Sequence, residues 1–163
     1  MKNIFLAIAM LISVAGYSQI QSVSLTASGL TCSMCSKAIY KALLKVPGIK
    51  SVDVNIEKSS YEITFDKGAT VSPEALKNAV EGAGFAVAQL DVMATLPKTT
   101  ISSGTKITLQ GSTYQFVKAN GQTVQGVQKL TVIDKAYLSS AQWKRYVKEL
   151  PAKRENGVFL VTL

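Results

Sequence analysis

The chain has 163 residues, of which 47% are hydrophobic and 17% are charged. This length allows one medium domain or two small ones, and the composition is that of a folded protein rather than a disordered one. Histidine is absent, which excludes catalytic triads, zinc enzymes and haem proteins that depend on it. The two cysteines, Cys32 and Cys35, are therefore the strongest candidates for metal binding or thiol chemistry.

Residues 1–18 have the pattern of a secretory signal peptide. Lys2 is followed by an apolar run from Ile4 to Val14, and small residues precede the expected cleavage ahead of Gln19. The run is well short of the ~20 residues that span a bilayer, so an uncleaved anchor is the less favoured alternative. No later segment has the length of a transmembrane helix, and we expect a soluble periplasmic or secreted protein.

The net charge of +8 is distributed unevenly along the chain. Residues 19–92 contain seven lysines and seven acidic residues, whereas residues 93–163 contain ten basic and three acidic residues. This asymmetry predicts two units with different surfaces. The segment 93–105, with Pro97, Gly104 and several serine and threonine residues, is predicted to be the linker between them.

Residues 19–92 predict six elements in the order strand, helix, strand, strand, helix, strand. Helical spacing of apolar residues predicts one helix from Ser33 to Val46 and another that begins at the sequence Ser72-Pro73-Glu74. Alternation of apolar and polar residues predicts strands at 22–27, 52–56, 61–65 and 85–90. The order is the βαββαβ arrangement of a ferredoxin-like α+β sandwich.

Residues 106–163 predict a small basic β-rich domain with one helix and no visible chemistry. Asn120-Gly121 is expected to form a hairpin turn, and Ser139 or Ser140 is expected to cap a helix from Ala141 to Leu150. The basic residues favour contact with an anionic membrane surface or an acidic protein. Export argues against nucleic acid as a partner. Strands are expected at 106–110, 114–118, 129–138 and 157–163.

Cys32 and Cys35 lie where the first predicted strand leads into the first predicted helix. Two intervening residues bring both sulfurs within reach of one ion, and a helix N-terminus favours thiolates. Copper(I) is satisfied by two thiolates, whereas zinc prefers four ligands; Met34, between the cysteines, is expected to point away from the ion. The same pair could form a redox dithiol or a structural disulfide, although a disulfide that closes so short a loop adds little stability.

The residues from Gly29 to Cys35, Gly-Leu-Thr-Cys-Ser-Met-Cys, resemble the Gly-Met-Thr-Cys-x-x-Cys motif of heavy-metal-associated domains. This family includes domains of copper chaperones, periplasmic mercury-binding proteins and metal-transporting P-type ATPases. Leu30 replaces the usual methionine, which packs beneath the loop in the family. The segment from Glu81 to Phe85 is similar to the family's segment before the last strand, where an aromatic residue or lysine lies close to the metal loop. The resemblance covers about Ser22 to Val92.

The resemblance implies an exported metallochaperone or scavenger, not an enzyme, that holds a soft ion between Cys32 and Cys35 and passes it on by ligand exchange. Copper(I) is the first candidate; zinc, cadmium and mercury are the alternatives. Lys37, Lys41 and Lys45 form either a solvated helix face or a docking surface for an acidic metal-donating or metal-accepting protein. The alternative function is a periplasmic thiol-disulfide oxidoreductase that uses the same pair.

Overall fold

The computed structural model describes residues 19–30, 33–151 and 155–163. The predicted signal peptide and two residues of the cysteine motif, Thr31 and Cys32, lie outside the described residues. Within the described ranges, no helix combines the length and the apolar character that a membrane span requires. The protein is an α+β structure, in agreement with the predicted class.

The elements of the neutral half come first along the chain. They are β1 (Gln19–Ser28), α1 (Ser33–Leu43), β2 (Ile49–Asn55), β3 (Ser60–Phe65), α2 (Pro73–Gly82) and β4 (Ala86–Ser102). Over its described residues, the basic half adds four strands, one α-helix and two short 3-10 helices, η1 and η2. These are β5 (Lys106–Leu109), β6 (Ser112–Phe116), β7 (Asn120–Val132), η1 (Lys135–Tyr137), α3 (Ser140–Tyr146), η2 (Val147–Glu149) and β8 (Val158–Thr162).

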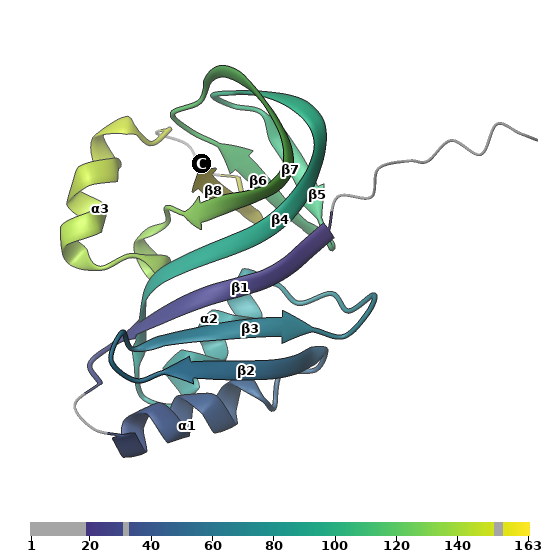
Figure 1. The fold of residues 1–163 in the computed structure, drawn as a ribbon. Helices are drawn as coiled ribbons and strands as arrows, with labels where there is room; N and C mark the ends of the chain where they lie inside the picture. The colour runs from purple at the N-terminus through teal and green to yellow at the C-terminus, as the bar shows by residue number, and fades with distance from the viewer. Residues whose placement is uncertain (1–18, 31–32, 152–154) are drawn as a thin grey trace, which may run out of the picture.

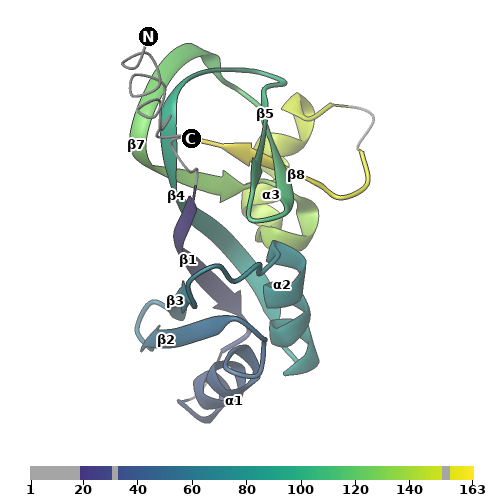
Figure 2. The ribbon, with the colours of Figure 1, turned by 90° about the vertical axis from the view of Figure 1, so that its right-hand side faces the viewer.

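In the described part of the chain, eight strands form one mixed sheet in the order β2-β3-β1-β4-β7-β8-β6-β5. β6 and β8 pair in parallel, whereas β1 is antiparallel to both β3 and β4. Figures 1 and 2 show α1 and α2 packed beside the first four strands, with α3 beside the strands of the basic half. The two halves are thus arranged along one continuous sheet.

Local sequence explains where α2 and α3 begin. Ser72 caps α2 by accepting a hydrogen bond from the N–H of Ala75, and Pro73 occupies the first turn, where its missing N–H costs nothing. Ser139 caps α3 in a reciprocal capping box with Gln142. Both expected helix starts are confirmed, although α3 ends at Tyr146 and the predicted last turn is the 3-10 helix η2.

Strand β4 joins the neutral and basic halves. It pairs with β1 from Ala86 to Thr95 and with β7 from Asp91 to Ser102, so the two pairings overlap. Most of the segment 93–105, which the sequence predicted to be a linker, is therefore strand. The same strand is an inner member of the sheet in both halves.

The alternation of buried residues explains why most of the segment 93–105 is a strand and not a linker. Ala94 and Leu96 are buried, whereas the residues beside them are more exposed. Pro97 is exposed and lies where the register between β4 and β7 shifts, so its missing N–H interrupts no regular part of the ladder. The proline and the hydroxyl residues indicated a linker, but the burial pattern is that of a strand. The division of the chain into two units stays a prediction.

The basic half also differs from expectation at one turn. The chain turns at Lys118, whose φ of 59° lies in the left-handed region, and β7 begins at Asn120. Asn120-Gly121 is therefore part of a strand, and the predicted hairpin turn at this dipeptide is wrong. The predicted strand over 129–138 is also too long, because η1 occupies its last part.

One hydrophobic core extends through both halves. Leu25 and Ile39 of the neutral half belong to the same buried cluster as Phe116 and Val161 of the basic half. A smaller second cluster lies under α3. It consists of Val117, Ile133, Leu138 and Leu160, with Trp143, Tyr146 and Leu150 packed against it.

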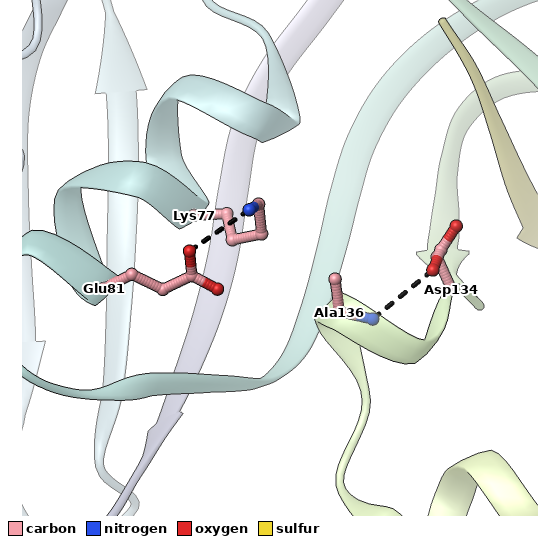
Figure 3. A network of polar contacts seen from close by, with 4 residues as sticks. All are labelled: Lys77, Glu81, Asp134 and Ala136. Carbon is pink, nitrogen blue, oxygen red and sulfur yellow. Dashed lines mark hydrogen bonds and ion pairs between the residues drawn. The ribbon is translucent and has the colours of Figure 1, made fainter. Parts of the chain in front are cut away.

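Helix α2 and η1 lie near each other where the halves meet. Figure 3 shows the 3.2 Å ion pair between Lys77 and Glu81 on α2, and Asp134, which accepts a hydrogen bond from the N–H of Ala136 at 3.3 Å. Lys77, Asp134 and Ala136 also line a cleft of about 270 Å³, together with Tyr137. Helix α2 and η1 thus line a shared cleft where the halves meet.

Candidate metal centre

The cysteine motif follows directly on the end of β1. Ser28 pairs with Ala86 at the start of β4, and its hydroxyl donates a hydrogen bond to the Ala86 carbonyl at 3.3 Å. Gly29 has a φ of +83°, a conformation that favours glycine and turns the chain out of the strand. Leu30 is half-buried against the core, so it packs as the methionine of the family motif is expected to pack.

The first turn of α1 carries the second cysteine. Cys35 is the third residue of the helix and is half-buried, whereas Ser36 beside it is buried. Cys32 lies outside the described residues, so the joint action of the two thiols stays a prediction. The first turn contains no acidic residue that would oppose the positive end of the helix dipole, and this end of α1 therefore suits anionic ligands.

Met34, which separates Ser33 from Cys35, is 71% exposed. The Met34 side chain therefore extends into solvent from the first turn of α1. The expectation that the Met34 thioether points away from the ion stays a prediction.

Tyr61 lies beneath the first turn of α1. Its side chain is fully buried, and its hydroxyl donates a long hydrogen bond of 3.5 Å to the carbonyl of Ser36. The pKa of Tyr61 is raised overall, mainly by burial and also by the negative charge that Cys35 can carry, and an interaction with the Ser36 side chain offsets part of the rise. Tyr61 therefore stays protonated near neutral pH and places an uncharged hydroxyl close to the cysteine.

The sequence interpretation assigned Tyr61 only to an alternating strand and missed this position. The available signal was a tyrosine at an inward-facing position of β3, because a buried tyrosine needs a partner for its hydroxyl. Strand alternation alone does not say which helix lies above the residue.

Phe85 lies at the same end of the sheet as the motif. It directly precedes Ala86, which pairs with Ser28, and its N–H donates to the carbonyl of Val80 at 3.2 Å at the end of α2. Its ring is half-buried against the core. The structure thus brings Phe85 and the start of the motif to neighbouring strand ends, as the resemblance implied.

The surface beside the motif combines lysines with an apolar cleft. Lys37, Lys41 and Lys45 are all exposed on or just after α1. A cleft of about 230 Å³ lies between α1 and the end of β2. It is lined by Ser33, Ser36, Lys37, Tyr40, Val54 and Ile56.

Residues 24–86 match the family model described as "Heavy-metal-associated domain". The "Mercuric transport protein periplasmic component" of Pseudomonas fluorescens is 38% identical over 86 residues, which are 52% of this chain and 93% of the relative. The protein of the same name from Shigella flexneri is 37% identical over the same shares. The chain belongs to the heavy-metal-associated domain family. Its N-terminal half thus contains a heavy-metal-binding domain.

Solved structures of the family are similar to the same half of the chain. Oxidized MerP from Ralstonia metallidurans CH34 is 38% identical, with 42% of this chain and 93% of that chain covered and a TM-score of 0.39. The structure described as "CopZ metallochaperone" is 30% identical, with 40% and 97% covered and a TM-score of 0.37. The family assignment rests on the sequence matches and not on these superpositions.

Proposed function

We propose that this protein is an exported carrier of a soft metal ion, which is held between the thiolates of Cys32 and Cys35. In this proposal, β1 to β4 with α1 and α2 act as the ferredoxin-like βαββαβ unit of the heavy-metal-associated domain. The observation that carries the proposal is the Cys-x-x-Cys pair in the sequence of a chain of this family, with its second cysteine in the first turn of α1. Two relatives are named as periplasmic components, which supports export.

Transfer of the ion would proceed by ligand exchange. A thiolate of the partner forms a bond to the ion, one Cys–metal bond then breaks, and the released sulfur takes a proton from solvent. No electron is transferred, and the ion keeps its oxidation state. An ion with two ligands leaves space for the entering thiolate, so exchange can be fast even though binding is tight.

The ligand chemistry suggests two ions. Copper(I) is the first candidate, because a soft monovalent ion is satisfied by two thiolates. Mercury(II) is the second candidate, because the relatives that share 37–38% identity are named as mercuric transport components. Zinc and cadmium would need further ligands, such as water or groups of a partner, to complete a four-coordinate site.

An acidic protein is the partner that fits the surface beside the motif. Lys37 and Lys41 are exposed on α1, and the cleft that includes Val54 and Ile56 offers apolar contact area next to them. Charges of this kind act mainly on the rate of encounter and on the choice of partner.

Competition titrations test the metal assignment. The reduced protein is titrated under nitrogen with copper(I), mercury(II) and zinc against chelators of known strength. We expect one soft ion per chain, bound far more tightly than zinc. The double variant Cys32→Ser with Cys35→Ser should lose this binding and keep the far-UV circular dichroism of the folded protein.

Two controls make the titration decisive. Met34→Ala removes the soft, exposed thioether between the cysteines and should leave the affinity unchanged. A double serine variant that still binds one soft ion tightly would refute the site. Failure of the unmodified protein to bind any soft ion, together with rapid disulfide exchange with a model substrate, would favour the oxidoreductase alternative.

A further inference from the structure

Helix α3 and η2 carry a cluster of exposed cations. Lys144, Arg145 and Lys148 are all exposed, and their spacing places them on one side of the helical segment. Lys118, from the turn before β7, joins the cluster by lying 5.5 Å over the ring of Tyr146. We call these four residues the α3 cationic surface.

The composition around this surface strengthens its positive field. Residues 135–148 contain four basic and no acidic residues, Asp134 and Glu149 directly flank them, and the basic half as a whole carries +7 against zero for residues 19–92. The two basic residues in the last turn of α3, Lys144 and Arg145, also stabilise the negative end of the helix. This local role does not account for Lys148 or Lys118, which lie outside α3.

Apolar and aromatic groups flank the cations. Trp143 and Tyr146 are half-buried against the second hydrophobic cluster, and Val147 is 43% exposed. Lysine and arginine next to partly exposed aromatic side chains are typical of helices at the surface of a lipid bilayer, where aromatic rings lie at headgroup level.

The helix is already fixed in place before any partner binds. The amide of Gln142 donates to Gln89 on β4 at 2.9 Å, and Gln89 in turn donates to Asp91 at 2.6 Å. Asp91 is buried and also accepts a 2.7 Å hydrogen bond from Thr131 on β7. Because this network anchors α3, docking through α3 would cost little entropy for ordering the helix.

We propose that the α3 cationic surface docks on an anionic phospholipid bilayer. This inference goes beyond metal carriage and depends on different residues. The stripe of Lys37, Lys41 and Lys45 on the neutral half is the main competing basic surface, but seven acidic residues balance the charge of that half. The α3 surface, in the +7 half, is the better match for a surface of uniform negative charge.

Docking through the α3 cationic surface would bring the metal-binding end of the protein toward the bilayer. The N–H of Ser139, at the start of α3, donates to the carbonyl of Ala88 at 3.0 Å. Ala88 precedes Gln89, which pairs with Thr26 near the end of β1, and the cysteine motif follows that end. In Figure 1, α3 and the start of α1 both lie toward the left of the view, where β1 ends. A docked α3 would hold the motif near a membrane-bound donor or acceptor of metal.

Vesicle flotation tests the proposal with the full protein. Vesicles that contain phosphatidylglycerol are compared with pure phosphatidylcholine at low salt. We expect binding to the anionic vesicles alone and release at about 0.5 M salt, where screening is strong. Nitroxide-labelled headgroups should quench Trp143, which is the single tryptophan of the chain.

Two triple variants with equal charge change locate the contact. Lys144→Gln with Arg145→Gln and Lys148→Gln should weaken vesicle binding about a hundredfold, at about fivefold per cation. The matched variant Lys37→Gln with Lys41→Gln and Lys45→Gln should bind vesicles within about twofold of the unmodified protein. Circular dichroism without vesicles establishes that each variant is folded.

Three outcomes would overturn the inference. Equal losses in both triple variants would mean that net charge alone drives binding. Binding without quenching of Trp143 would place the contact elsewhere on the molecule. Absence of vesicle binding by the unmodified protein, with binding to soluble polyglutamate, would assign the surface to an acidic protein instead.

Discussion

Because the neutral and basic halves share strand β4, we expect them to unfold together. Leu25 is fully buried in β1, where it pairs with Tyr61 of β3 and Leu90 of β4. Its cluster continues without a break to Val161 in β8. Leu25→Ala removes three buried carbon atoms from this core, which costs about 3 kcal/mol of unfolding free energy.

Trp143 reports on the far half of the molecule. It packs against the second cluster under α3, and its emission can be followed during urea denaturation. For a chain of this size, unfolding free energy falls by about 2 kcal/mol per molar urea. Leu25→Ala should therefore lower the urea midpoint at Trp143 by about 1.5 M, although the substitution lies in the other half.

The control is the same substitution at an exposed site. Leu44 follows α1 and is 41% exposed, so Leu44→Ala should change stability by about 0.5 kcal/mol or less. Circular dichroism at 222 nm, which includes α1 and α2, is recorded in the same titrations. If the dichroism midpoint of Leu25→Ala falls while the Trp143 midpoint stays constant, the halves unfold separately and the reasoning from β4 is refuted.

Two further predictions concern stability. Burial raises the pKa of Tyr114, and burial together with nearby carboxylates raises the pKa of Tyr137. Both side chains therefore keep their protons in the folded protein at pH values where the unfolded chain releases them. Each tyrosine makes its full contribution to the free energy of unfolding below about pH 10. Above about pH 10, the free energy of unfolding should fall by about 1.4 kcal/mol per pH unit for each tyrosine. Urea midpoints from pH 9 to 11.5 measure this slope, and Tyr137→Phe should reduce it; an unchanged slope would contradict the assignment. At Gly48, with φ +90°, an added Cβ would lie 2.8 Å from the Cβ of Ala69, whereas at Gly68, with φ +79°, it would meet open space. Gly48→Ala should thus cost about 3 kcal/mol and Gly68→Ala about 1 kcal/mol in thermal or urea unfolding, and equal costs would exclude the clash as the cause.

Local sequence patterns predicted the starts of helices well. Ser72-Pro73 and Ser139 identify the starts of α2 and α3, because caps and first-turn prolines act within one turn of the chain. The motif around Cys35 likewise follows from residues that are adjacent in sequence. Signals of this range depend little on the rest of the fold.

Features that depend on distant partners were harder to predict. The continuation of β4 through Pro97 depends on β7, which supplies the second ladder more than twenty residues later in the chain. Tyr61 gains its place beside Cys35 from the packing of α1 on β3, which strand alternation does not encode. The Asn120-Gly121 turn failed for the same reason, since Asn120 pairs with Ser102.

The charge distribution separates this protein into two halves, whereas the hydrophobic core joins them. The neutral and basic halves have separate surfaces, one with the cysteine motif and the other with the α3 cationic surface, but they share β4 and one hydrophobic core. Docking at one surface therefore fixes the orientation of the other, because both halves share β4. The hydrogen bond from Gln142 to Gln89 also connects α3 to this strand. A carrier built in this way would present its metal in one orientation relative to the bilayer, which favours exchange with a partner fixed in the same membrane.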